Sequence, residues 1–432
     1  MEEAGCPPKF LEVVRQLHTG MHGWVSNEGL ASDAFPIRTG VKQGCVLAPT
    51  LFSIFLGAFL AVATQKVTGS INIEYRIGGL MNIRRFEAKT RISQCTVTEL
   101  QYADDLTIAA NTISDLQSIV DGFTQAYKAF GLTINVSKTQ ILSQPQPANS
   151  PTEQIFIEGT PLVRVDCFKY LGSYLSSAAD IDHEVKSRIS AASRSFGRLR
   201  DRVFDSHELS LSTKLLVYRA VVIPTLLYGS ESWVTYRRHL NDLDCFHMRC
   251  LRSLLKIRWQ DKISNEKVLY QAGCSNISTL VMSERLRWLG HLNRMSDDRL
   301  PKRLLFGQMK DAPRRPGGQK KRFKDVCKIT MKAFGLDVKS WESESKARDS
   351  WRHQLHLGSA QFEKARLSKH RIKHSQTTQP SQSPTRPLHS FSPSSSPSSS
   401  SSETFPCDLC GRLCRSRIGL HSHLAAHRRK MR

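Results

Sequence analysis

The chain has 432 residues, 40% of them hydrophobic, and a formal net charge of +24 from 62 basic and 38 acidic residues. This apolar content excludes a wholly disordered chain, and the charge argues against cationic substrates. The charge lies mainly near the C-terminus, because residues 301–432 hold 28 basic and 9 acidic residues. A nearly neutral body with a basic C-terminal region predicts a polyanionic partner, above all nucleic acid.

Eight of the eleven cysteines lie singly in the first 330 residues. This scatter predicts reduced thiols in an intracellular protein, nuclear or cytoplasmic, and not a disulfide scaffold. One run, Val46–Thr64, is mostly apolar and close to the ~20 residues that span a bilayer. Pro49 and several small or polar residues interrupt it, and no second such run follows. We therefore expect a buried core helix and no membrane partner, with a transmembrane helix as the alternative.

Periodicity predicts a mixed N-terminal part of helices and strands. Helices are expected at 8–22, 49–64 and 112–130, and strands at 71–75, 132–136, 156–157 and 167–175. The run 96–109 is broken only by Asp104-Asp105, which predicts a hairpin with two carboxylates at its tip.

Beyond residue 180 the pattern becomes helical, with apolar residues three and four apart at 181–199, 209–227 and 240–255 and mostly helical sequence over 260–372. A Ser/Pro-rich stretch at 375–402 predicts a disordered linker. The expected fold class is α+β. The expected divisions are 1–177, 178–300, 301–374, 375–404 and a compact module at 405–432.

The sequence Tyr102-Ala103-Asp104-Asp105 is the sharpest signal in the body of the chain. Two adjacent acids in an apolar strand pattern reduce stability unless a cation meets them. Divalent metals do so in phosphoryl transfer, because Mg²⁺ binds carboxylate and phosphate oxygens together. On these four residues alone, a solvent-exposed Asp-Asp turn remains the alternative.

Three further motifs surround this pair in order: GVKQGCVLAPTLF at Gly40–Phe52, FGLTIN at Phe130–Asn135 and FKYLG at Phe168–Gly172. The ordered set resembles the reverse transcriptases of non-LTR (LINE-like) retrotransposons. LLYGSESW at Leu226–Trp233 and RLRWLGHLNRM at Arg285–Met295 also resemble the thumb and following region of that family. The resemblance covers about residues 1–350.

The resemblance implies a right-handed arrangement of partial palm, fingers and thumb that binds an RNA and DNA template–primer and deoxynucleoside triphosphates with Mg²⁺. Its implied site residues are Asp104 and Asp105 for the metal, Lys138 near the triphosphate, Gln43 and Gly44 at the nucleotide and template pocket, Tyr102 under the primer end, and Tyr170, Leu171 and Gly172 in the primer grip. Gln43 and Lys138 also fit ordinary surface residues.

One departure from the family concerns a third metal-binding aspartate. The family's palm holds it on a strand upstream of the helix that Pro8–Met21 resembles, where this chain has only Glu2 and Glu3. Two metal ions need carboxylates both from that upstream strand and from the Asp104-Asp105 hairpin. We therefore expect a C-terminal portion of such a polymerase, from a truncated copy or an incomplete gene model, that is inactive alone. A non-catalytic nucleic-acid-binding protein and a zinc-finger regulator with a decayed polymerase passenger are the alternatives.

The C-terminal module has the Cys₂His₂ zinc-finger spacing, with the ligands Cys407, Cys410, His423 and His427. The usual base-reading positions hold short side chains, at Ser416, Gly419 and Ser422. This predicts sequence-tolerant binding of nucleic acid, although a protein-binding finger stays open. Further phosphate contacts are expected from the basic run Arg314, Arg315, Lys320, Lys321 and Arg322.

Overall fold

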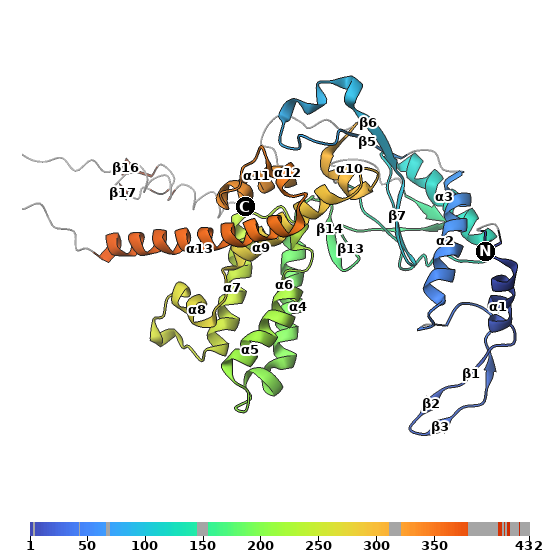
Figure 1. Cartoon of the computed structure of the whole chain (residues 1–432), viewed down its shortest axis with the longest axis horizontal. Helices are drawn as coiled ribbons and strands as arrows, with labels where there is room; N and C mark the ends of the chain where they lie inside the picture. Colours follow the sequence, from blue (N-terminus) through green and yellow to red (C-terminus); the bar gives the residue numbers. More distant parts are fainter. Residues whose placement is uncertain are drawn as a thin grey trace, which may run out of the picture. The chain divides into compact units, whose positions relative to one another are not determined.

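The computed structural model describes residues 1–2, 5–42, 44–65, 70–144, 154–310 and 321–378, with 405–407, 410, 413–414 and 423 near the C-terminus. The chain divides into two compact units, 1–373 and 374–432 (Figure 1). Helices and strands are mixed in the first unit, which confirms the α+β class. The expected Ser/Pro linker lies almost wholly outside the described residues.

The N-terminal segment contains a helix, two small strand pairs and a long apolar helix. Its elements are α1 (Pro8–His18), β1 (His22–Gly23), β2 (Ser26–Asn27), β3 (Leu30–Ala31), β4 (Phe35–Pro36) and α2 (Ala48–Gln65). Pro8 begins α1, where its missing N–H needs no partner, and the helix ends before Gly20, whose φ is 70°. Strand β1 pairs with β4 and β2 with β3, both antiparallel.

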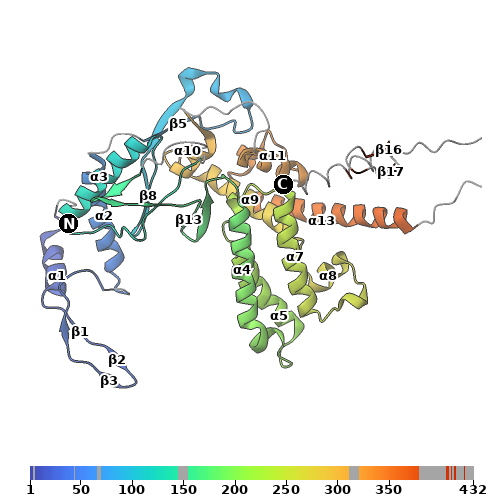
Figure 2. The ribbon, with the colours of Figure 1, turned by 180° about the vertical axis from the view of Figure 1, so that it is seen from behind.

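Helix α2 is less buried than the sequence predicts. Phe59 and Ala63 are fully buried against α3 (Ile113–Ala129), the helix that lies beside α2 in Figure 2. The Phe59 ring stacks on Tyr127 with 4.2 Å between centroids. Only 17% of α2 is buried, so the expectation of a buried core helix is wrong for most of its surface. An apolar helix does not show in its sequence which face is covered. Among the described helices, α2 alone is long and apolar enough to cross a bilayer, a property that core helices share.

Three strands and a hairpin follow α2. Strands β5 (Ile71–Tyr75) and β6 (Ser93–Val97) pair antiparallel, and β15 (Gly307–Met309) joins the other edge of β5. Strands β7 (Glu99–Tyr102) and β8 (Asp105–Ile108) form the predicted carboxylate hairpin. Part of the expected 96–109 run thus belongs to another sheet, because alternation alone does not reveal where a strand changes partner.

The segment from 130 to 177 forms short strand pairs. They are β9 (Gln140–Ile141) with β12 (Val163–Arg164), β10 (Phe156–Ile157) with β11 (Thr160–Pro161), and β13 (Cys167–Tyr170) with β14 (Ser173–Ser176). The strand expected at 132–136 is wrong. There Asn135 closes a turn instead, because its side-chain oxygen accepts the Lys138 backbone N–H at 3.2 Å.

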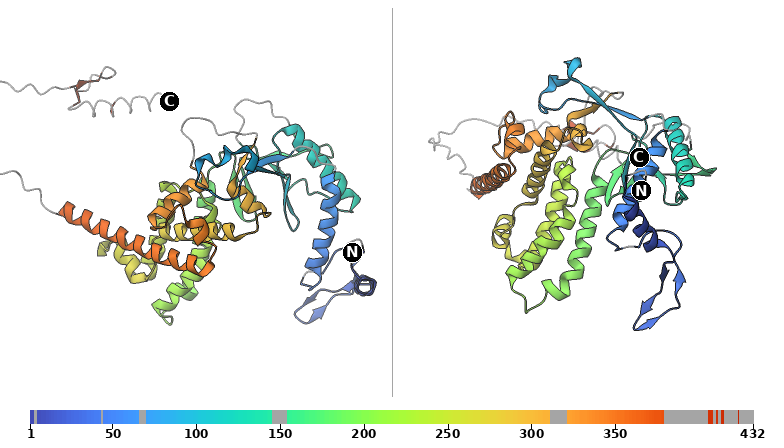
Figure 3. Two further views of the ribbon diagram at one scale, coloured as in Figure 1. Left: turned by 45° about the horizontal axis from the view of Figure 1, so that its top comes forward. Right: turned by 45° about the vertical axis from the view of Figure 1, so that its right-hand side comes forward.

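The predicted helical region is confirmed. It contains α4 (Asp182–Leu199), α5 (Leu211–Val217), α6 (Ile223–Leu226), α7 (Arg237–Leu254), α8 (Asn265–Ala272) and α9 (Ile277–Arg294). The helix expected over 209–227 is interrupted by a π-helical turn at Tyr218–Val222, which places the Tyr218 ring in the core. Helices α4 and α7 pack side by side (Figures 1 and 3).

The remaining helices are α10 (Leu300–Phe306), α11 (Phe323–Ala333), α12 (Trp341–Glu344) and α13 (Arg348–Thr378). Leu80, from the loop between β5 and β6, is fully buried in one core with Trp341 and Trp351. With β15 paired to β5, this core joins the basic C-terminal helices of the first unit to an early hairpin. In the second unit, β16 (Phe405–Pro406) pairs with β17 (Leu413–Cys414).

Candidate nucleic-acid interface and metal centre

The two carboxylates lie at the tip of the β7–β8 hairpin. Tyr102 pairs with Asp105, so Ala103 and Asp104 form a two-residue turn, and Ala103 has a positive φ of 51°. Such turns match the twist of the flanking strands. Both aspartates are exposed, and no hydrogen bond or ion pair from a described residue reaches either carboxylate. The hairpin thus presents free carboxylate oxygens that could bind a divalent cation.

The structure describes three of the other four predicted pocket residues, and all three are exposed. Tyr102 is 66% exposed beside the aspartates. Gly44 is exposed with a φ of 87°, while Gln43 lies outside the described residues. Lys138 is exposed in the turn closed by Asn135, and no described hydrogen bond or ion pair joins it to either aspartate.

The predicted primer grip is the turn of the β13–β14 hairpin. Leu171 and Gly172 both have positive φ, 46° and 83°, as a type I′ hairpin turn requires. The Tyr170 hydroxyl donates to the Leu100 carbonyl of β7 at 3.1 Å. This bond connects the turn to the carboxylate hairpin.

Residues of the helical region after residue 180 hold the same turn from the other side. The Tyr228 hydroxyl donates to the Leu171 carbonyl at 3.0 Å, and the Arg188 guanidinium donates to the Gly172 carbonyl. Arg188 also forms an ion pair with Glu184 at 2.7 Å, and its guanidinium carbon lies 4.6 Å from the centre of the Tyr228 ring. The two ion-pair side chains are only 12% and 3% exposed, which makes this pair part of the interior.

Beside the turn lies a cavity of about 710 Å³. Tyr170, Leu171 and Ser173 line one side, and Arg219 and Tyr228 the other. Glu231 and Glu284 also line the cavity, and the hydroxyls of Tyr170 and Tyr228 already donate to the Leu100 and Leu171 carbonyls. Its walls therefore combine the Arg219 guanidinium with two carboxylates.

Of the five basic residues assigned to phosphate contacts, the structure describes two. The Lys321 ammonium lies 5.3 Å from the Tyr236 ring centre, and Arg322 forms an ion pair with Asp325 at 2.9 Å. Arg314, Arg315 and Lys320 lie outside the described residues. Arg322 therefore has a carboxylate partner within the protein.

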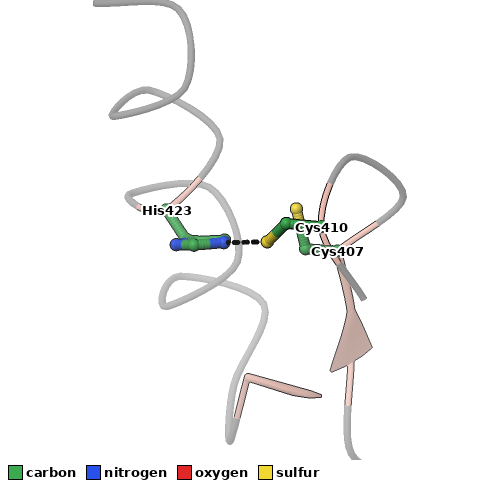
Figure 4. Close-up of side chains that lie close together, drawn as sticks. All are labelled: Cys407, Cys410 and His423. Carbon is green, nitrogen blue, oxygen red and sulfur yellow. Dashed lines mark hydrogen bonds between the residues drawn. The ribbon is translucent and has the colours of Figure 1, made fainter. Parts of the chain in front are cut away.

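Three of the four predicted zinc ligands lie together. The Cys407 and Cys410 sulfurs and a His423 ring nitrogen all lie within 4.8 Å of one another (Figure 4). The Cys410 Sγ to His423 Nε2 distance is 3.0 Å. Zinc bonds of ~2.3 Å to sulfur and ~2.0 Å to nitrogen place tetrahedral ligands about 3.6–3.8 Å apart. The two sulfurs and the nitrogen thus fit a zinc site once the Cys410 sulfur and the His423 nitrogen move slightly apart. His427 lies outside the described residues.

Sequence reasoning missed the residues that support the grip turn. Glu184 and Arg188 have the spacing of a helical ion pair, which could have been noticed, but nothing in that spacing indicates their bonds to β14 and to the turn. It also missed Arg285, whose guanidinium donates to the Trp233 carbonyl and the Thr235 hydroxyl, both at 3.1 Å. Burial lowers the pKa of Arg285.

Comparison with known proteins agrees with these motifs. Residues 1–175 match the family described as reverse transcriptase (RNA-dependent DNA polymerase). The chain is 24% identical over 260 residues to the RNA-directed DNA polymerase of the mobile element jockey from Drosophila melanogaster. That match covers 59% of this chain and 26% of the jockey protein, so the chain spans about a quarter of that relative.

Two further relatives are also transposon proteins. A transposon-derived protein of Caenorhabditis elegans is 24% identical over 272 residues, which cover 60% of this chain and 96% of that protein. The Pol polyprotein of the retrotransposable element R2DM from Drosophila melanogaster is 26% identical over 176 residues, or 39% of this chain and 15% of its own length. Residues 1–175 are therefore a reverse transcriptase domain with homologues in non-LTR retrotransposons of the jockey and R2 kinds.

Proposed function

We propose that this retroelement-derived protein binds primed template through its reverse transcriptase domain but does not extend the primer by itself. The observation that carries the proposal is the solitary carboxylate pair at the β7–β8 tip. Among the described residues, no third His, Cys, Asp or Glu lies close enough to Asp104 and Asp105 to complete a metal cluster. In two-metal phosphoryl transfer the ions lie about 3.5–4 Å apart and need more ligands than two adjacent aspartates provide.

In this proposal, Asp104 and Asp105 hold one Mg²⁺ with water and phosphate oxygens in the remaining positions. The metal supplies charge neutralisation at the phosphates when it is bound. Lys138 contributes a positive charge on the same domain. If a complete site is assembled, this charge would help to bind the triphosphate. Deoxynucleoside triphosphates are substrates only in that case.

The grip turn is the second part of the proposal. Leu171 and Gly172 present backbone to a strand lying in the adjacent cavity, and the thumb bonds from Arg188 and Tyr228 fix that backbone in place. A turn fixed from both sides loses little entropy when it binds a primer, which favours binding. RNA and DNA in a primed hybrid are therefore the proposed partners.

The C-terminal module completes the proposal as a zinc finger. Cys407, Cys410 and His423 support one Zn²⁺, with His427 as the fourth ligand by its spacing. Arg428, Arg429 and Lys430 follow this ligand and provide charge for phosphates. A zinc-finger regulator that only carries the polymerase domain is the competing function, and it assigns all nucleic-acid binding to this module.

A matched pair of glycine substitutions tests the proposal. Gly172→Ala strains the grip turn, because its φ of 83° disfavours any side chain, while the added Cβ lies at an ordinary contact distance of 3.6 Å from the Tyr228 ring. Gly159→Ala is the control, because Gly159 also follows a positive-φ residue in a two-residue hairpin turn but has open space around an added Cβ. Both carry the same backbone strain, of about 1–2 kcal/mol.

Binding is measured by fluorescence anisotropy with a DNA primer annealed to an RNA template. We expect several-fold weaker binding for Gly172→Ala than for Gly159→Ala, and largely unchanged binding when residues 405–432 are deleted. Binding that disappears with residues 405–432 and ignores Gly172→Ala would refute the proposal in favour of the zinc-finger regulator.

A further inference from the structure

A second cavity, of about 860 Å³, lies far along the chain from the carboxylate hairpin. It opens between the loop joining β5 to β6 and the helices α11 and α12, which lie together in Figure 1. Three lysines line it: Lys328 and Lys332 on α11, and Lys339 in the loop before α12. Glu342 of α12 holds the two sides together by accepting the backbone N–H groups of Gly79 and Leu80.

The positive charge of this cavity is only partly neutralised by the acids that line it. Among the described residues, none of the three lysine ammonium groups forms a hydrogen bond or an ion pair. The two acids beside them are engaged elsewhere. Glu342 accepts the loop N–H groups at 3.0 and 2.7 Å, and Asp337 accepts the backbone N–H groups of Lys339 and Ser340, both at 3.1 Å. These bonds orient both carboxylates toward backbone donors but leave them charged, so three lysines against two acids give the cavity a net charge of +1.

The rest of the wall combines a donor with apolar surface. The Asn82 side-chain oxygen accepts the Arg84 N–H at 3.0 Å, which leaves its amide nitrogen to donate. Leu336 and Val338 form the accessible apolar part, whereas Trp341 lines the cavity but is only 1% exposed and belongs to the core behind this floor. Ammonium groups above an apolar floor suit a ligand that carries phosphate next to a flat, weakly polar group.

The lysines also continue along α11. Lys324, Lys328 and Lys332 lie four residues apart and so form one row on the helix, with about 6 Å of rise between neighbours. The row begins two residues after Arg322, at the end of the basic sequence Arg314–Arg322. A polyanion held by that sequence therefore has further cations to follow toward the cavity.

We propose that this cavity and the lysine row form a binding site for single-stranded nucleic acid. Lys328, Lys332 and Lys339 hold successive phosphates, and a base or sugar lies against the floor of Leu336 and Val338. An unpaired strand fits better than a duplex, because only an unstacked base reaches an apolar wall. This site does not depend on the grip turn or on the carboxylate hairpin.

The test uses the full chain and two fluorescein-labelled 20-nucleotide probes, oligouridine RNA and oligothymidine DNA. The variant replaces Lys328, Lys332 and Lys339 with Gln. Its control replaces Lys267, Lys364 and Lys369 with Gln, three exposed lysines that also lack an ion pair among the described residues. Both triple variants lose the same charge.

On single strands, losing three phosphate contacts should reduce the slope of log affinity against log salt by about 2. Near 0.1 M salt this change corresponds to about 100-fold weaker binding. We expect this loss in the cavity variant and a much smaller one in the control. A loss with RNA alone assigns the site to RNA, and a loss with both probes assigns it to either strand. Equal slopes for the two triple variants would overturn the proposal.

Arg at the same three positions provides the second readout. Because Arg keeps the charge, the Arg variant should retain the salt slope of the unmodified chain. If the Arg variant lost as much affinity as the Gln variant, a change in the shape of the cavity would explain the loss. That result would refute the phosphate contacts. The Gly172→Ala protein should bind these unprimed strands normally, which separates this site from the grip.

Discussion

The hydroxyl of Tyr170 donates to the carbonyl of Leu100 at 3.1 Å and so joins the β13–β14 hairpin to the hairpin that carries Asp104 and Asp105. The two residues are far apart in the sequence, and no periodic pattern connects them. The bond fixes the distance from the grip turn to the carboxylates, which a polymerase needs if a primer end is to lie at the metal.

We predict that Tyr170→Phe lowers the free energy of unfolding by about 1 kcal/mol, the usual net value of one hydrogen bond. Urea unfolding of the full chain measures it. Tyr270→Phe is the control, because Tyr270 is 86% exposed and its hydroxyl has no hydrogen-bond partner among the described residues. Equal stability of the two variants would show that the Tyr170 bond contributes nothing.

Arg188→Met should destabilise the protein by about 3–5 kcal/mol, because it leaves the buried Glu184 carboxylate without its cation. Arg15→Met removes a comparable helical pair, with Glu12, whose side chains are 73% and 51% exposed. That control should change stability by less than about 1 kcal/mol. Similar urea midpoints for both variants would contradict the role given to Arg188.

These two relationships show what could be predicted from the sequence and what could not. The carboxylate hairpin, α3 and the helices after residue 180 have local signals, either alternation or three-and-four spacing, and were predicted. Partners distant in sequence have no such signal. The pairing of β15 with β5, the insertion of Leu80 between α11 and α12, and the bonds to the grip turn depend on tertiary packing alone.

Some errors have a local cause. The strand expected at 132–136 is an open segment between two turns, because the Leu132 N–H donates to the Tyr127 carbonyl at the end of α3 and the Thr139 N–H donates to the Asn135 carbonyl. The buried helix expected at 49–64 is largely exposed because a helix that is apolar on all sides gives no information on which neighbours cover it. In the C-terminal module, the ligand spacing predicted the gathering of Cys407, Cys410 and His423.

Stability should depend on pH through His247, which is fully buried and whose Nδ1 lies 2.8 Å from the Tyr218 hydroxyl. Burial lowers the pKa of His247 from 6.5 to about 4. Between these values the unfolded state binds a proton that the folded state does not. Stability from this group is thus complete above about pH 6.5 and falls by about 3 kcal/mol as the pH approaches 4.

The measurement is urea unfolding of the full chain and of His247→Gln from pH 7.5 to 4. Taking the difference in unfolding free energy between the two proteins removes the pH dependence that both share, such as that from Asp182 and Asp205, whose pKa values are lowered. We expect the difference to shrink steadily below pH 6.5. A constant difference over this range would show that His247 is protonated equally in both states.

The metal centre should bind one equivalent of zinc, and Cys407→Ser should abolish that binding. Cobalt substitution gives the readout, because thiolate ligands produce intense charge-transfer and tetrahedral d–d absorption that weakens when one sulfur is lost. Cys245→Ser is the control, since Cys245 is an exposed cysteine outside the module. Stoichiometric tetrahedral cobalt binding by Cys407→Ser would exclude the assigned ligands.

Primer extension tests the central claim most directly. The 432-residue chain is incubated with a DNA primer on an RNA template, all four deoxynucleoside triphosphates and either Mg²⁺ or Mn²⁺, at protein concentrations where the hybrid is shown to be bound. We predict a bound primer that gains no nucleotide, because Asp104 and Asp105 alone cannot hold two metals. Template-directed extension that disappears in Asp104→Asn would contradict the account and show that another carboxylate completes the site.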